Sequence, residues 1–311
     1  MTAASAAWVH AAPGLRLADV PVAEPGPDEV QLRVRAVGFN RRDVDAANGA
    51  RAGTVPGSDA VAEVIAVGEL VAGLRLGQRV VTLFVGGWRD GPPPTALRIR
   101  GGGGREGVLR RTMVCPAADV VAIPDTLDDA DATWLPCAGV TAWNALDRLA
   151  AAGAPQVLIG GGGAVAAAAM AVAGWRGWPI AAAVSAATPL PAGVQRIDRV
   201  VAGWGRELAP RVDAALALGA GMAELHAAVR PGGRILVVST RGGAPDAQQL
   251  ILRQQTAEGV FTGAASQVAA MAAAMAERGL RLPRPRAFAW AAADEALLAA
   301  GRGERVCVMA G

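Results

Sequence analysis

Residues Val157–Ala169 read VLIGGGGAVAAAA, an apolar run that ends in four glycines and continues as an alanine-rich segment. This order predicts a strand, a tight turn and a helix. Glycine allows the turn and the close approach of a phosphate, and a helix N-terminus offers unpaired N–H groups and a positive dipole end. Gly161, Gly163 and Ala166 fit the G-x-G-x-x-G/A spacing of a dinucleotide-binding turn. Because glycine and alanine are abundant throughout the chain, the spacing alone is also compatible with coincidence.

Short apolar strands alternate with helix patterns around this turn, which predicts a parallel, doubly wound sheet. The predicted strands are Val157–Ile159, Ile180–Val184, Val200–Val201, Ala214–Leu218 and Ile235–Val238. The predicted helices are Ala130–Ala150 (broken near Pro136), Ala164–Ala173, Met222–Val229 and Ser266–Arg278. The first third is β-rich instead, with alternating patterns in Glu29–Val37 and Val61–Val67, and a strand pattern returns at Val306–Val308.

Composition narrows the possible chemistry. The chain has 311 residues, 52% of them hydrophobic, which is enough for two domains with buried cores. It contains no tyrosine and no lysine, so a Tyr–Lys proton relay, a Schiff-base lysine and a P-loop lysine are excluded. The two histidines, His10 and His226, cannot build a histidine-rich metal site, and we expect His226 to be exposed or to cap a helix.

The chain also lacks the marks of other protein classes. Its three cysteines show no C-x-x-C spacing, which argues against a disulfide framework or a zinc lobe. The apolar stretch at 160–174 is too short and too rich in alanine and glycine for a membrane span. The chain has no dense basic stretch of the kind that binds nucleic acid, and no secretory leader is evident. We therefore expect a cytoplasmic enzyme that binds neither nucleic acid nor membrane.

Several motifs in fixed order carry a family resemblance. They are EPGPDEV at 24–30, GFNRRD at 38–43, PGSD at 56–59, VG at 67–68 with LGQRV at 76–80, LPCAGVTAW at 135–143, and RPGGR at 230–234. Together they resemble the medium-chain dehydrogenase/reductase superfamily, specifically its zinc-free, quinone-oxidoreductase-like branch. In zinc-dependent members a cysteine follows the first glycine and a Gly-His-Glu occupies the second motif. Here Phe39-Asn40 and Gly57-Ser58-Asp59 stand in those places, so the resemblance implies no metal.

The resemblance implies a Rossmann-type doubly wound parallel sheet plus a β-rich, GroES-like catalytic domain. Residues 1–127 and 281–311 would form the catalytic domain, and 128–280 the nucleotide-binding domain. The nucleotide-binding domain is shortened, because only about 22 residues run from Ile180 to Val201 where a βαβ unit needs about 30 or more. It implies catalytic roles for Asn40 and Asp43 and substrate contacts for Phe39, Asp59, Trp88 and Trp143. It implies cofactor contacts for Thr141, Gly161, Gly162, Gly163, Ala164, Val165, Ser185, Ser239, Thr240 and Phe261.

Five residues of these motifs have a plainer alternative. Asn40 and Asp43 can be an N-cap pair that opens a short helix. Trp143 can serve packing, Asp59 can cap a turn, and Cys137 can be a small buried hydrophobe rather than a nucleophile.

The resemblance implies hydride transfer from NADPH or NADH to a small-molecule quinone, enone or enoyl-type acceptor in a homodimer. Two departures leave an alternative open. No tyrosine can donate the proton, so solvent, Asp43, a hydroxyl or Cys137 must do so. The segment 183–188 holds neither an acid for the ribose nor an arginine for a 2′-phosphate, and Arg196 is the nearest arginine. The alternative is a relative without cofactor that uses the same cleft for dehydration, cyclisation or binding only.

The loop at 86–107 is long and irregular. Five arginines surround Gly101–Gly104, at positions 98, 100, 105, 110 and 111. The segment is either a solvated connector or a lid that recruits an anionic or carrier-bound substrate.

Overall fold

The computed structural model describes residues 3–12, 14–47, 49–101, 104–150, 155–198, 203–208 and 211–311. The chain divides into two compact units. The first comprises Met1–Val140, Gly263–Gly279 and Arg284–Gly311, and the second Thr141–Thr262 and Leu280–Pro283.

These limits differ from the predicted boundaries at 127/128 and 280/281, because residues 128–140 and 263–279 contact the first unit. For example, Asp129 accepts a 2.8 Å hydrogen bond from Arg35, and Ala265 N donates to Trp88 O at 2.9 Å.

The first unit is built on a largely antiparallel sheet. Its main path runs β16-β17-β3-β4-β5-β9, with β8 paired to β3. The strands are β3 (Glu29–Gly38), β4 (Asp59–Val67), β5 (Arg79–Thr82), β8 (Thr112–Pro116), β9 (Val120–Ala122), β16 (Arg286–Ala289) and β17 (Val306–Met309). The strands predicted at Glu29–Val37, Val61–Val67 and Val306–Val308 are confirmed. Because β17 pairs with β3, the final segment of the chain completes the first unit.

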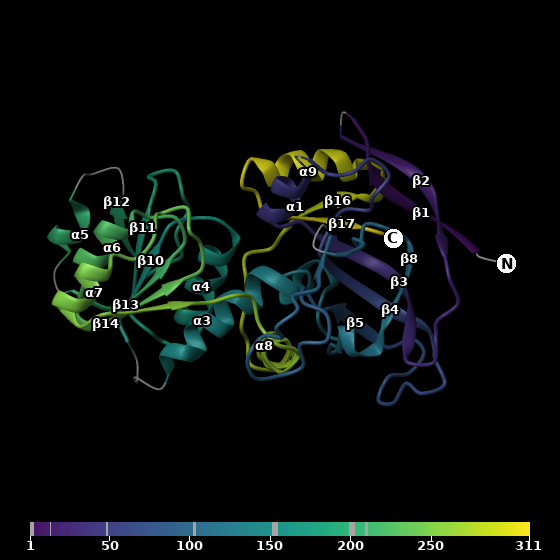
Figure 1. The fold of residues 1–311 in the computed structure, drawn as a ribbon, viewed down its shortest axis with the longest axis horizontal. Helices are drawn as coiled ribbons and strands as arrows, with labels where there is room; N and C mark the ends of the chain where they lie inside the picture. Colours follow the sequence, from purple (N-terminus) through teal and green to yellow (C-terminus); the bar gives the residue numbers. More distant parts are fainter. Residues whose placement is uncertain are drawn as a thin grey trace. The chain divides into compact units, whose positions relative to one another are not determined.

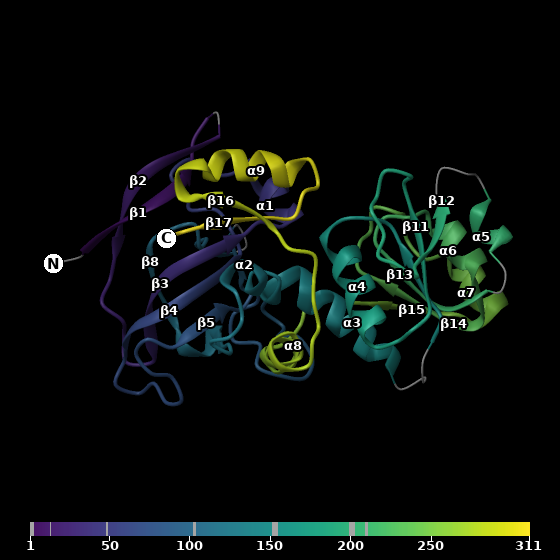
Figure 2. The same ribbon diagram turned by 180° about the vertical axis from the view of Figure 1, so that it is seen from behind.

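A hairpin and several helices complete this unit. The hairpin joins β1 (Ala3–His10) to β2 (Leu15–Val22), and β6 (Ile99–Arg100) pairs with β7 (Gly104–Arg105). The helices are α1 (Arg41–Ala47), α2 (Asp129–Ala132), α8 (Ala265–Glu277) and α9 (Ala293–Gly301). In Figure 2, α9 lies over β16 and β17, and it also packs against α1.

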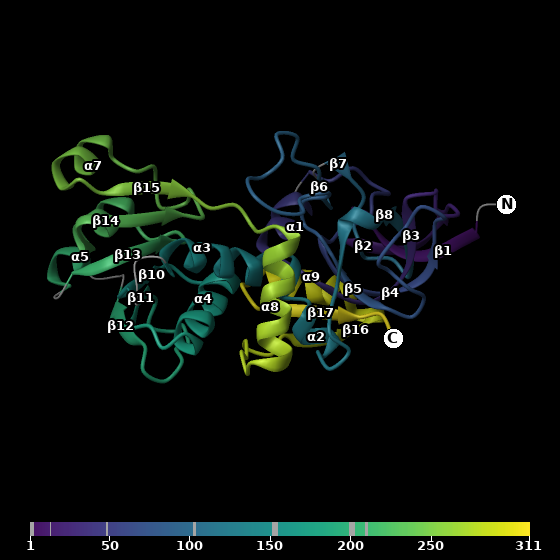
Figure 3. The same ribbon diagram turned by 90° about the horizontal axis from the view of Figure 1, so that it is seen from below.

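The second unit contains a parallel sheet of six strands among its described residues. Their order is β12-β11-β10-β13-β14-β15, and Figure 3 shows them side by side in that sequence. They are β10 (Val157–Gly160), β11 (Ile180–Val184), β12 (Gln195–Asp198), β13 (Val212–Ala217), β14 (Val229–Val237) and β15 (Thr256–Gly259). This order is that of a doubly wound dinucleotide-binding fold, so the predicted fold class is confirmed. The strand predicted at Val200–Val201 lies outside the described residues.

The helices of this unit include those predicted at Ala164–Ala173 and Met222–Val229, together with two that the sequence does not predict, at Trp204–Glu207 and Ala247–Arg253. The helices are α3 (Val140–Ala150), α4 (Ala164–Trp175), α5 (Trp204–Glu207), α6 (Met222–Ala228) and α7 (Ala247–Arg253); Figure 1 shows α6 and α7 together beside β13 and β14. The break predicted near Pro136 is confirmed, because a π-helical turn at Leu135–Gly139 separates α2 from α3. Between β11 and β12 the described residues 185–194 form turns and no helix, which shortens the unit.

Across the described residues, no helix is both long enough and apolar enough to span a membrane.

Candidate active site

The turn after β3 begins the candidate site. Asn40 precedes α1 and Asp43 lies in its first turn, where the carboxyl oxygen Oδ2 of Asp43 accepts a 2.7 Å hydrogen bond from Asn40 N. In return Asp43 N donates to Asn40 O at 3.0 Å. The Asp43 carboxyl thus caps the Asn40 N–H, which is one half of a capping box, whereas the side-chain amide of Asn40 is directed to other partners.

That amide joins a group of four buried polar residues. Asn40 Nδ2 donates to Ser58 Oγ at 3.1 Å and to Asp59 Oδ2 at 2.7 Å. Ser58 Oγ also lies 3.0 Å from Asp59 Oδ1 and 3.3 Å from Asp43 Oδ2. Asn40 is 7% exposed, and the other three side chains are almost completely buried. We call Asn40, Asp43, Ser58 and Asp59 the carboxyl cluster.

Two arginines supply positive charge next to this cluster. Arg305, just before β17, donates to Phe39 O at 2.8 Å and to Thr133 O at 2.6 Å. Its guanidinium stacks over the ring of Trp134, 4.6 Å from the ring centre. Arg42 lies on α1, with its Nη1 at 3.7 Å from Asp43 Oδ1. A buried pair of carboxyl groups is therefore accompanied by two cations from opposite ends of the chain.

Burial raises the pKa values of both aspartates towards neutral pH. It raises the pKa of Asp43 to about 7, and the neighbouring Asp59 carboxyl adds to the rise. Burial also raises the pKa of Asp59 to about 6, although Arg305 and Asn40 act in the opposite direction. Carboxyl groups with pKa values in this range can exchange a proton near neutral pH, which is what general acid–base chemistry needs.

Cys137 lies near the same group, on the π-helical turn. Burial raises the pKa of its thiol well above the usual value, and the Asp59 and Asp43 carboxyl groups raise it further. It packs against the small apolar cluster of Phe84, Val85, Trp88 and Ala264. These surroundings hold the sulfur as a neutral thiol, which favours a packing role over a nucleophilic one.

The positions that hold zinc ligands in the resemblance have different chemistry here. Asn40, Ser58 and Asp59 hydrogen-bond to one another, and the Asn40 Nδ2 donor occupies the centre of the group. Within the described part of the chain, no group of three or more His, Cys, Asp or Glu side chains is arranged to hold a metal.

The glycines of the turn in the second unit differ in their φ angles and in the space around them. Gly161 has φ +132°, and a Cβ there would lie 2.4 Å from Leu218 O. Gly163 has φ +94° and precedes α4 without a side-chain cap. A Cβ added to Gly162 or to Gly163 would meet no described atom within 4 Å. The turn thus leaves open space beside the first N–H groups of a helix of 12 residues.

Other predicted cofactor residues follow strand ends in the same sheet. Ser185 follows β11, Ser239 and Thr240 follow β14, and Phe261 follows β15. Because the strands are parallel, these residues and the glycine turn lie at the same edge of the sheet. Ala164 and Val165 begin α4, whereas Thr141 lies in the first turn of α3 and is buried.

Arg196 reaches the turn after β11, which the sequence alone does not reveal. From β12 it donates to Ser185 O at 2.8 Å and to Thr188 O at 2.6 Å. The parallel pairing of β12 with β11 places Arg196 opposite Ala182 and so brings its charge to this loop.

Three of the residues predicted to contact substrate each pack against neighbours in their own unit. Phe39 is in the core of the first unit, and Trp88 is buried with its Nε1 donating to Gly91 O at 3.0 Å. Trp143 lies in the second unit, 5.9 Å from the ring of Trp175 and under the guanidinium of Arg176. Of the four, only Asp59 belongs to the carboxyl cluster.

The arginines of the loop mostly have partners inside the first unit. Arg100 and Arg105 both pair with the buried Asp119. Arg110 bonds to Glu106 and to Pro21 O, and Arg111 lies 4.5 Å from the ring centre of Trp290. These contacts favour the connector interpretation over the lid.

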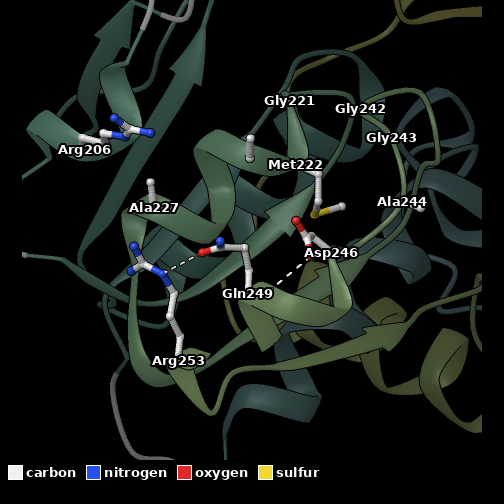
Figure 4. A pocket seen from close by; sticks show the side chains of 11 residues that line it. Arg206, Gly221, Met222, Ala227, Gly242, Gly243, Ala244, Asp246, Gln249 and Arg253 are labelled. Atoms are coloured by element: carbon white, nitrogen blue, oxygen red, sulfur yellow. Dashed lines mark hydrogen bonds between the residues drawn. The ribbon is translucent and has the colours of Figure 1, made fainter. Parts of the chain in front are cut away.

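The second unit also carries a pocket of about 520 Å³ between α6 and α7 (Figure 4). Arg206, Met222, Asp246, Gln249 and Arg253 are among its lining residues, and none of the predicted cofactor residues is.

Next to this pocket, His226 is buried rather than exposed, which corrects one of its two predicted roles. Its Nε2 accepts from Asp246 N at 3.1 Å, at the start of α7, and its Nδ1 lies 2.8 Å from Gln255 Oε1.

Comparison with known proteins places these features in context. Residues 26–125 match the alcohol dehydrogenase GroES-like domain. A zinc-type alcohol dehydrogenase-like protein of Schizosaccharomyces pombe is 36% identical over 126 residues, which cover 39% of this chain and 36% of the relative. A chloroplastic quinone-oxidoreductase of Triphysaria versicolor is 29% identical over 144 residues, which cover 44% of this chain and 39% of the relative. The chain thus spans little more than a third of the length of these two curated relatives.

A solved structure covers far more of the chain. A Sinorhizobium meliloti protein assigned as an alcohol dehydrogenase superposes with a TM-score of 0.85 at 28% identity, covering 99% of both chains.

Proposed function

Because the chain belongs to the medium-chain dehydrogenase/reductase superfamily, we propose that it is a zinc-independent oxidoreductase that transfers hydride from NADPH to a quinone, enone or enoyl-type acceptor. The observation that carries the proposal is the carboxyl cluster. Where a zinc-dependent relative would need metal ligands, this chain has an amide, a hydroxyl and a carboxyl group bonded to one another. A zinc ion is stabilised by thiolate, imidazole or carboxylate ligands that face it, and the N–H groups of an asparagine amide repel it.

The glycine turn supports a dinucleotide. Gly161 satisfies the sharp backbone turn, and Gly163 leaves room for a phosphate at the start of α4. The residues that would hold the pyrophosphate are 161–165, and Ser239 and Thr240 would lie along the nicotinamide. When bound, the reduced nicotinamide supplies the hydride.

The surroundings of Arg196 support NADPH over NADH. The turn at 185–188 contains two hydroxyl groups and no acid, and Arg196 holds its carbonyl groups while its guanidinium remains exposed. A 2′-phosphate favours a nearby guanidinium, whereas an unphosphorylated ribose favours a carboxylate.

We also propose a homodimer formed through β15. This strand ends the described sheet, so one of its edges presents N–H and C=O groups without a neighbouring strand. On the preceding helix, Ile251 is 75% exposed and Leu252 69% exposed. Light scattering on the wild type and on Leu252→Arg tests this: a dimer that the substitution converts to a monomer supports it, and a wild-type monomer contradicts it.

The function is tested in two stages. Nicotinamide fluorescence during titration with NADPH and with NADH measures binding, with Gly163→Val as the variant that should lose it. Stereospecifically deuterated NADPH is then incubated with a quinone, an enone and an enoyl thioester, and mass spectrometry detects a reduced product that carries one deuterium. Binding without deuterium transfer to any acceptor contradicts the proposed acceptors. Undetectable NADPH binding contradicts the function itself and favours dehydration, cyclisation or binding without a cofactor.

A further inference from the structure

The hydroxyl of Ser58 has two carboxyl neighbours but only one hydrogen to donate. Ser58 Oγ is within 3.3 Å of Asn40 Nδ2, Asp59 Oδ1 and Asp43 Oδ2. A hydroxyl group has one hydrogen to donate and two lone pairs that accept. The amide of Asn40 must donate, so it uses one lone pair. The single hydrogen of Ser58 then serves only one of the two carboxyl groups.

One additional proton completes this arrangement. If both aspartates were ionised, the second carboxylate would face the Ser58 oxygen with no hydrogen between them, buried and repelled. If one carboxyl group is protonated, it donates to the second lone pair of Ser58, and Ser58 donates to the other carboxylate. Each short contact of Ser58 then contains a hydrogen.

The partners of the two aspartates indicate where this proton resides. Asp59 accepts from Asn40 Nδ2 and from Ser58, one donor on each oxygen, and it is close to Arg305. Asp43 accepts from Asn40 N on Oδ2. Its Oδ1 lies 3.7 Å from Arg42 Nη1 but is buried without a hydrogen-bond partner among the described residues. Asp43 is therefore the better proton carrier, and Asp59 the better carboxylate.

We propose that Asp43, Ser58 and Asp59 share one proton across the Ser58 hydroxyl and that this shared proton is the one consumed in the reduction. The reactive part of the inference rests on the proposed function. Ser58 is a positioning residue in this scheme, because it acts through the two carboxyl groups. The charged and titratable groups that face the trio are Arg42 from α1, Arg305 from the segment before β17, and Cys137 from the π-helical turn.

The chemistry balances with the components already named. The cofactor gives two electrons and one hydrogen as hydride, and the acceptor then needs one proton to become neutral. An O–H bond of a carboxyl group in the trio breaks as the new bond to hydrogen forms on the acceptor. Both carboxyl groups are then ionised, and the trio regains its proton from water. The charge left behind is balanced by the two neighbouring guanidinium groups.

Other proton donors are less suitable in this chain. It has no tyrosine or lysine. His226 is already bonded through both ring nitrogens. The thiol of Cys137 has a pKa raised well above its usual value, so it gives up its proton less readily than either aspartate.

Infrared spectroscopy on the protein alone tests the shared proton. Between pH 5 and pH 9 we expect a carbonyl band of a protonated carboxyl group that shifts in heavy water and disappears as the pH rises through about 6 to 7, the range to which burial raises the pKa values of Asp59 and Asp43. The band should be lost in Asp43→Asn. In Ser58→Ala, which retains both acids, its midpoint should change, because the hydroxyl that links the two carboxyl groups is removed. No such band in the folded wild type at pH 5 overturns the proposal.

Turnover gives the second measurement. General acid–base groups contribute about 100-fold or more, so Asp43→Asn should lower kcat by about 100-fold while leaving the NADPH dissociation constant unchanged. Ser58→Thr keeps the hydroxyl and should restore the pH profile that Ser58→Ala alters. Circular dichroism confirms that each variant is folded. Wild-type kcat and pH profile in folded Asp43→Asn overturn the catalytic role. Because the infrared band needs no NADPH, a failure of the proposed function leaves that result independent.

Discussion

Arg305 donates a 2.8 Å hydrogen bond to the main-chain oxygen of Phe39, so the segment before β17 holds the turn on which the candidate active site begins. The two residues are 266 positions apart in the sequence. The same guanidinium bonds to Thr133 O and stacks on Trp134. It thereby connects the strand β3, the segment before the π-helical turn and the last strand of the sheet.

Removing this guanidinium should destabilise the protein strongly. Arg305→Met removes the donor to Phe39 O and to Thr133 O and the positive charge that lowers the pKa of the buried Asp59. Each lost hydrogen bond from a charged group is worth about 1.5–3 kcal/mol. Urea unfolding at pH 7 measures the loss. Arg286→Met is the matched control, since Arg286 pairs with Glu304 on the surface with a side chain 61% exposed, and it should change stability by less than about 1 kcal/mol. Equal losses in both variants would contradict the electrostatic role, and the added substitution Asp59→Asn should recover part of the Arg305→Met loss.

Stability should depend on pH through the two buried aspartates. Their folded-state pKa values of about 7 and about 6 lie above the unfolded value of about 3.9. The folded protein therefore binds more protons than the unfolded chain between about pH 4 and 7, so this stabilisation is present at low pH and lost as pH rises through that range.

The contribution of Asp43 to this pH dependence of stability can be measured by substitution. Each extra bound proton contributes up to about 1.4 kcal/mol per pH unit. Asp43→Asn should flatten the decline and be more stable than the wild type at pH 8, as measured by urea unfolding at pH 5, 6, 7 and 8. Asp45→Asn changes an exposed carboxyl group of the same helix and should follow the wild-type slope. An unchanged slope in Asp43→Asn would rule out its titration in this range.

The glycine turn offers a comparison between adjacent positions. Gly163→Val should reduce NADPH affinity by about 2–4 kcal/mol, because a side chain there obstructs the charge-assisted N–H contacts of a phosphate. The positive φ of Gly163 adds about 1–2 kcal/mol of strain, which thermal unfolding without cofactor measures separately. Gly162→Ala introduces a Cβ into open space at an ordinary φ and should leave the thermal stability unchanged. NADPH affinity that survives Gly163→Val would show that phosphate does not bind at this turn.

Arg196 should determine the choice between the two nicotinamide cofactors. Arg196→Ala removes a charge beside the turn at 185–188, and one lost charged hydrogen bond is worth about 1.5–3 kcal/mol. We expect NADPH affinity to fall about tenfold to a hundredfold while NADH affinity stays the same, as measured by fluorescence titration of each cofactor. A parallel fall for both cofactors would mean that Arg196 only supports the loop.

The sequence predicts the parts of the fold that depend on local patterns. The strand, turn and helix around Gly161 and the alternation in β3 follow from residue type and spacing, and the motif order gives the superfamily. Asn40, Asp43 and Asp59 can be selected because they lie within motifs. Ser58 is the site residue that the sequence analysis did not select, although it stands in the same motif as Asp59. A hydroxyl next to an acid in the sequence can hydrogen-bond to two carboxyl groups.

Other features depend on distant pairing that no local pattern records. Arg305 reaches Asn40 only because β17 pairs with β3, and Arg196 reaches Ser185 only because β12 pairs with β11. The short spacing between β11 and β12 does predict a shortened unit. The packing of Trp143 against Trp175 and Arg176 is not predictable, because an aromatic residue in a motif looks the same whether it contacts substrate or a neighbouring helix.

The dependence of the first unit on β17 also has a consequence for biosynthesis. During translation the ribosome makes Asp43 and Asp59 long before Arg305, so the nascent chain holds two acids with only one of their two neighbouring cations, Arg42. The second unit, formed almost entirely by 141–262, has its strands complete by then and is free to fold first. Until the last segment emerges, β3 lacks its pairing with β17, and we expect this unpaired stretch to favour aggregation. Chaperone demand should therefore be concentrated in the segment synthesised first, and an mRNA cut before the codon for Arg305 should yield an insoluble product.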